Sequence, residues 1–126
     1  MKQISQIKPR ESVRVDQERL SALYAQLGES SAEDVVCRAM EELALRLSHC
    51  DRLFRTGDMQ ELRKSARSLI AIAEQIGMDD VSRVANDVTV CVDAQDDVAI
   101  AATLQRLMRS GEGSLTAVWD MQDIYI

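Results

Sequence analysis

Residues 58–85, DMQELRKSARSLIAIAEQIGMDDVSRVA, contain the strongest helical signal of the chain. Apolar side chains recur here at steps of three and four, which places them on one face of an α-helix. In the first half of the stretch, this face is made of Leu62, Ala66, Leu69, Ala73 and Ile76. Gly77 follows and can end the helix in a left-handed conformation. We therefore predict a hairpin of two antiparallel helices, over residues 58–76 and 79–92.

The same spacing continues on both sides of the hairpin. It predicts further helices over residues 15–27, 32–55 and 96–109. Along residues 32–55, the apolar side chains form a narrow seam typical of antiparallel bundles: Val36, Met40, Leu43, Leu47, Cys50 and Phe54. Ser31, with Asp34 three residues later, matches a capping box that would start this helix.

The ends of the later helices have their own signals. We expect the aspartate pairs 79–80 and 96–97 to cap the N-termini of the helices that follow them. Gly111-Glu112-Gly113 is expected to end the helix over 96–109, and Ser114 to cap a short helix reaching Trp119.

The terminal sequence WDMQDIYI is apolar enough to need cover. One interpretation is that Trp119, Ile124 and Tyr125 fold back and plug the open end of the bundle. The other is that this segment forms a homodimer contact, since an apolar terminus left in water is an interaction site.

Together these elements predict an all-α, up-and-down antiparallel helical bundle with four main helices and short flanking helices. We assign residues 14–126 to this single domain and residues 1–13 to an N-terminal arm. The residues expected at the centre of its core are Leu47, Leu62, Leu69, Val84, Val88 and Leu104.

The composition argues against several classes of function. The chain has 126 residues, of which 46% are hydrophobic and 29% charged, as in a globular protein. Its net charge of −6 argues against general nucleic-acid binding, and no apolar run reaches the length of a membrane span. Cys37, Cys50 and Cys91 stand far apart on apolar-periodic positions, so we expect reduced, buried thiols of a cytoplasmic protein, with no metal or other cofactor.

Catalytic constellations are not evident. His49 is the sole histidine, and its neighbours Cys50 and Asp51 diverge around a helix, so the three cannot converge as a catalytic set. Adjacent carboxylates such as Glu41 and Glu42 point about 100° apart and are not acid/base dyads. We predict that the protein is not an enzyme, while phosphotransfer through His49 remains an alternative.

The segment beginning at residue 58 resembles the helical hairpin of histidine-containing phosphotransfer (HPt) domains. Their pattern H-x-L-K-G-x-x-x-x-x-G lies on an exposed helix, and its histidine carries a phosphoryl group between aspartates of partner proteins. In this chain Arg67 stands at the histidine, Leu69 at the leucine and Ile70 at the lysine. Ala71 stands at the first glycine and Gly77 at the second.

This resemblance covers roughly residues 43–108 and lacks the phosphoacceptor. An arginine stays protonated and is a poor nucleophile, so position 67 cannot accept phosphate. The resemblance therefore implies a pseudo-phosphotransferase of bacterial two-component signalling, an adaptor or inhibitor that binds a receiver domain or a histidine kinase. The alternative is a structural or assembly bundle that acts through homodimerisation.

The candidate partner-binding residues lie around the phosphoacceptor position: Arg67, Arg63, Lys64, Ile70 and Glu74. At 100° per residue, Arg63, Arg67 and Glu74 share one side of the helix, with Ile70 at its edge. We expect Arg67 to be exposed, and Ile70 partly so. A guanidinium there could dock into the carboxylates that surround a receiver's phosphoaspartate. The competing interpretation is a solvated helix face on which Arg67 pairs with nearby glutamates.

Overall fold

The computed structural model describes residues 14–124, with side chains described as far as Met121. The predicted arm, residues 1–13, lies outside this range. Five helices make up the described chain: α1 (Gln17–Leu27), α2 (Glu29–Thr56), α3 (Met59–Gln75), α4 (Asp79–Asp93) and α5 (Asp97–Ile124). No strand occurs among these residues, so the all-α prediction is confirmed.

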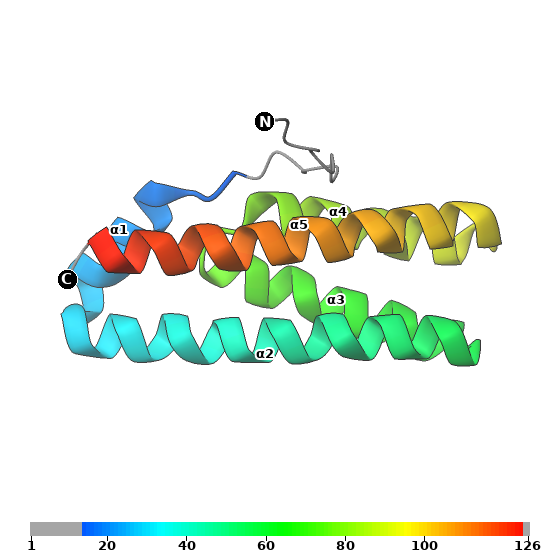
Figure 1. The fold of residues 1–126 in the computed structure, drawn as a ribbon, viewed down its shortest axis with the longest axis horizontal. Coiled ribbons are helices and arrows are strands. Elements are labelled where there is room, and N and C mark those ends of the chain that lie inside the picture. The colour runs from blue at the N-terminus through cyan, green and yellow to red at the C-terminus, as the bar shows by residue number, and fades with distance from the viewer. Residues whose placement is uncertain (1–13, 125–126) are drawn as a thin grey trace, which may run out of the picture.

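Helices α2 to α5 form the bundle (Figure 1). α3 packs against α2 and α4, and α5 packs against α4 and α2, which closes the ring. Short turns join α2, α3, α4 and α5 in succession, so each of these runs antiparallel to the one before it, as predicted, whereas α1 runs at a steep angle to α2 (Figure 1). α1 packs against α2 at the end of the bundle where α2 begins.

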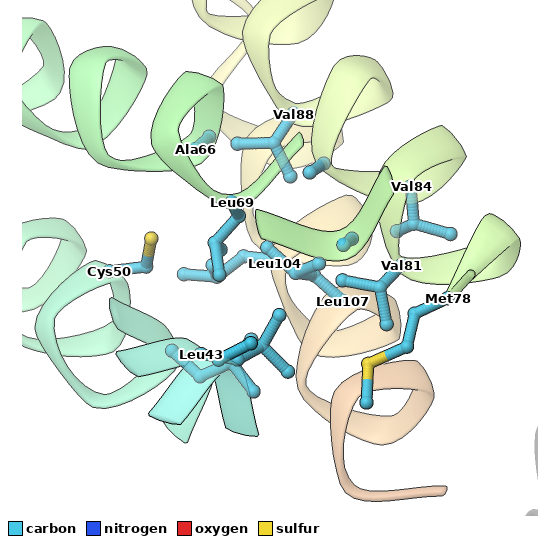
Figure 2. Close-up of a cluster of buried hydrophobic side chains, with 14 of the residues drawn as sticks. Leu43, Cys50, Ala66, Leu69, Met78, Val81, Val84, Val88, Leu104 and Leu107 are labelled. Carbon is cyan, nitrogen blue, oxygen red and sulfur yellow. The ribbon is translucent and has the colours of Figure 1, made fainter. Parts of the chain in front are cut away.

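The core lies between these four helices, and all six residues predicted at its centre are buried. Figure 2 shows side chains from each bundle helix meeting there: Leu43, Cys50, Ala66, Leu69, Val84, Val88, Leu104 and Leu107. On α3 the predicted face of Leu62, Ala66, Leu69 and Ala73 is fully covered. This burial turns the opposite side of α3 toward solvent, which positions the candidate site.

Helix starts differ in part from prediction. Asp96 does cap α5, because its carboxylate accepts a hydrogen bond from the Ala99 N–H at 3.1 Å. The capping box at Ser31 is wrong: α2 begins two residues earlier, at Glu29, directly after Gly28. The aspartates 79–80 are not the cap of α4 either, since Met78 occupies that position and both aspartates lie in the first turn.

The largest correction concerns α5, which continues through Gly111 and Gly113 to Ile124 instead of breaking. A Cβ atom on Gly111 would lie only 2.4 Å from Leu47 Cδ1, so the glycine is where α5 and α2 come into close contact. Packing against α2 therefore overrides the weak helix propensity of glycine.

The predicted plug of the bundle end is also wrong at Trp119, whose residue surface is 58% exposed on α5. The Ile124 side chain and Tyr125 lie outside the described part. Among the three free cysteines, Cys50 is buried as predicted, whereas Cys91 is half-buried and Cys37 is exposed. Within residues 14–124, no helix is both long enough and apolar enough to cross a membrane.

Candidate functional site

The candidate site lies on α3, on the side that borders α4. Arg63 reaches across to Asp93 at the end of α4, with Nε 2.7 Å from Oδ1 and NH2 3.1 Å from Oδ2. Two parallel N–H···O bonds of this kind are the strongest geometry for an arginine and a carboxylate. The hydrogen bonds from Arg63 are the main reason that the pKa of Asp93 is lowered, and the charges of Arg63 and Arg67 add to the effect.

A second contact sets the register of the two helices. The Ser82 hydroxyl on α4 lies 3.4 Å from Glu74 Oε1 on α3 and donates to it. Eleven residues separate Arg63 from Glu74, and eleven separate Asp93 from Ser82, so both contacts follow one antiparallel register. This register places Arg67 level with Thr89.

Arg67 itself is exposed, as the helical spacing predicts. Within the described residues no carboxylate forms an ion pair with it, so the predicted pairing with glutamates does not occur there. Thr89, level with it on α4, is buried, and its hydroxyl already donates to the Asn86 carbonyl at 2.7 Å. The guanidinium of Arg67 therefore remains available to a ligand from outside.

The other candidate residues have different surroundings. Ile70 is half-buried, as expected for the edge of the apolar face. Lys64 lies 3.3 Å from Glu61, one turn earlier on α3, and remains 74% exposed. Arg63 and Lys64 thus form ion pairs, whereas Arg67 is exposed and forms none within the described residues.

His49 is half-buried on α2, in a shallow depression that it shares with Glu42, Leu45, Arg46 and Arg52. Its neighbours diverge as predicted. Cys50 points into the core, and Asp51 forms an ion pair with Arg55 one turn later. Burial raises the pKa of the Cys50 thiol, which therefore stays protonated and unreactive.

Sequence reasoning missed a groove between α2 and α5, with a volume of about 480 Å³. Its apolar lining is formed by Phe54, Ala101, Leu104 and Met108, and charged residues border it. The sequence does not indicate this groove, because Phe54 and Met108 follow the same helical spacing as the core residues. Only the spacing between the two helices shows that they border an opening.

No set of three or more histidine, cysteine, aspartate or glutamate side chains is arranged to hold a metal ion in the described range. Comparison with known proteins reveals no relative: no protein-family model, no curated protein and no solved structure matches the chain. What the α3 face can bind therefore follows from its own charges and contacts.

Proposed function

We propose that this protein is a non-catalytic, HPt-like signalling protein of the bacterial cytoplasm that binds a receiver domain or a histidine kinase of a two-component phosphorelay. The observation that supports this function is the exposed Arg67 guanidinium, which has no ion-pair partner among the described residues. In the resemblance to HPt domains, Arg67 stands at the position of the phosphoacceptor. A planar guanidinium offers five N–H donors and suits a cluster of carboxylates.

Arginine at this position allows binding but not phosphoryl transfer. The transfer needs a nitrogen that can attack phosphorus, and the protonated guanidinium has no free electron pair for this. A bundle that occupies the acidic pocket of a receiver would keep a functional phosphodonor out. This chemistry favours an inhibitor or adaptor over a relay component.

The surroundings of Arg67 support docking. The charge of Arg67 helps to lower the pKa of Asp93, but both oxygens of that carboxylate already accept hydrogen bonds from Arg63. Arg67 therefore keeps its charge for a partner. Half-buried Ile70, one turn along α3, packs against the edge of the core and adds an apolar border beside Arg67.

The test is the charge reversal Arg67→Glu, assayed by titration against receiver domains and histidine kinases of the same genome. We expect binding to weaken about tenfold or more, which equals about 1.4 kcal/mol, because the new carboxylate faces an acidic pocket. The melting temperature should stay nearly unchanged, since Arg67 is exposed and unpaired within the described residues.

Arg52→Glu is the matched control, because Arg52 is also exposed, lies on α2 and has no ion pair in the described part of the chain. It should bind like the wild type. Failure of the wild type to bind any receiver or kinase would refute the proposal. Self-association under the same conditions would favour the structural homodimer, and radiolabel on His49 after incubation with a phosphodonor would favour phosphotransfer.

A further inference from the structure

A large apolar side chain is exposed on α4 close to Arg67. Val90 has 56% of its surface in solvent, although valines at Val84 and Val88 of the same helix are fully buried. At 100° per residue, position 90 lies about 120° around the helix from Val84 and about 160° from Val88, on the side away from the core. Val90 is therefore an outward-facing residue on α4.

The register of α3 and α4 places Val90 beside Arg67. The Arg63–Asp93 and Glu74–Ser82 contacts set Arg67 level with Thr89, so Val90 is displaced from it by one residue, a rise of about 1.5 Å along the helix axis. Both side chains are exposed at this level. Thr89, at the same level of α4, is buried.

The charge at this place is positive. Asp93 lies one turn beyond Val90 on α4, but Arg63 binds both of its carboxylate oxygens. A cation and an exposed branched side chain thus share one surface, and Arg67 forms no ion pair there within the described residues. Scattered exposed valines are ordinary, but a valine level with an unpaired arginine makes a combined apolar and cationic patch.

We propose that Arg67 and Val90 form one docking surface across α3 and α4, and that the partner presents an acidic pocket bordered by an apolar side chain. This inference rests on the proposed function and names the chemistry of the partner surface. Arg67 enters the acidic pocket and orients the complex. Val90 packs on the apolar border and excludes water from the ion pair, which strengthens it.

The two residues should differ in their response to salt. A contribution from Arg67 is electrostatic and weakens as ions screen the charges. A contribution from Val90 comes from the burial of apolar surface and persists at high salt. Titrations at low and high ionic strength therefore separate the two parts of the surface.

The test is Val90→Ser, titrated against the receiver or kinase that binds the wild type. We expect the dissociation constant to rise about threefold or more at both ionic strengths, from the loss of apolar burial. Val90→Thr, which keeps the branched shape, should show a smaller rise in the same direction. The loss caused by Arg67→Glu should shrink as salt is added.

Val98→Ser is the matched control, because Val98 is 81% exposed and lies on another helix, in the first turn of α5. It should bind like the wild type, and all variants should have the same melting temperature as the wild type. If Val90→Ser binds normally while Arg67→Glu is weakened, the extended surface is wrong and the proposed function stands. Equal weakening by Val98→Ser also overturns the inference. Absence of any wild-type binding overturns the proposed function itself.

Discussion

Arg63 and Arg67 lie four residues apart on the same side of α3, yet they have different surroundings. Arg63 is held in two hydrogen bonds by Asp93, whereas Arg67 has no ion pair within the described chain. Their helical positions are equivalent, and the difference arises because α4 ends level with Arg63. A neighbouring helix thus decides which of two similar arginines is structural and which is available to a partner.

Leu69→Ala is expected to destabilise the protein by about 2–5 kcal/mol, because Leu69 is fully buried between the helices and its loss leaves a cavity. Urea unfolding of both proteins measures this difference. Leu45→Ala is the control, since Leu45 is 72% exposed on α2 and should change stability by about 0.5 kcal/mol or less. Equal midpoints for wild type and Leu69→Ala would contradict the core assignment.

Helices α5 and α3 show how packing modifies local preference. Glycines at 111 and 113 suggest a break, yet α5 is continuous, because Gly111 lets it approach Leu47 of α2. On α3 the apolar periodicity alone predicts the buried face. Periodicity succeeds where a helix is amphipathic, but the role of a glycine depends on the surface that it meets.

Gly111→Ala tests this role. Alanine gains about 1 kcal/mol of helix propensity, but its methyl group would meet Leu47 Cδ1 at 2.4 Å, and overpacking a core costs about 1–3 kcal/mol. We therefore expect Gly111→Ala to lower the stability of the protein when Leu47 is present. In a Leu47→Ala background the clash is absent, so the same change should stabilise. Chemical denaturation of the four proteins measures the coupling, and stabilisation in both backgrounds would contradict close packing at this point.

The stability contributed by the Arg63–Asp93 pair, which joins α3 and α4, should depend on pH. The pKa of Asp93 is lowered in the folded state, mainly by the hydrogen bonds from Arg63. The carboxylate therefore contributes stability above its unfolded pKa, near 4, and this contribution is lost as the pH falls through the lower folded value. Asp93→Asn should lose less stability than the wild type between pH 7 and pH 3. Parallel pH profiles of urea midpoints would contradict the pairing.

At one end of the bundle, residues 14–16 are hydrogen-bonded to the α3–α4 turn and the start of α4. Asp80, only 3% exposed, accepts hydrogen bonds from the Arg14 backbone N–H and from Arg83 NH2 at 2.6 Å. The Asp16 N–H donates to the Gly77 carbonyl at 2.7 Å. These bonds attach the segment before α1 to the α3–α4 turn, so α1 is joined to the bundle from two sides.

Asp80→Asn should therefore loosen this end. The amide cannot accept both charge-assisted hydrogen bonds, and each is worth about 1.5–3 kcal/mol when a charged group takes part. We expect a lower melting temperature and faster trypsin cleavage after Arg19. Asp79→Asn, an exposed change in the same turn, is the control. Identical cleavage rates for wild type and Asp80→Asn would show that the contact does not hold α1.

The apolar periodicity of residues 58–85 was sufficient for the α3–α4 hairpin and for the burial of Leu69, and the same periodicity in the flanking segments was sufficient for the all-α bundle. Burial in a helix repeats every 3.6 residues, so it is recorded locally along the chain. Exposure of Arg67 follows from the same spacing. The resemblance to a phosphotransfer domain also comes from the sequence, and it remains a hypothesis about function.

Other features depend on residues distant in the chain. Arg63 meets Asp93 30 residues later, and Arg14 meets Asp80 66 residues later. The continuity of α5 depends on its contact with Leu47 on α2, and the patch of Arg67 and Val90 depends on the register of two helices. Sequence periodicity specifies which side of each helix is covered, but not which neighbour covers it. Interhelical ion pairs, close approaches and combined surfaces are therefore settled only when the helices pack together.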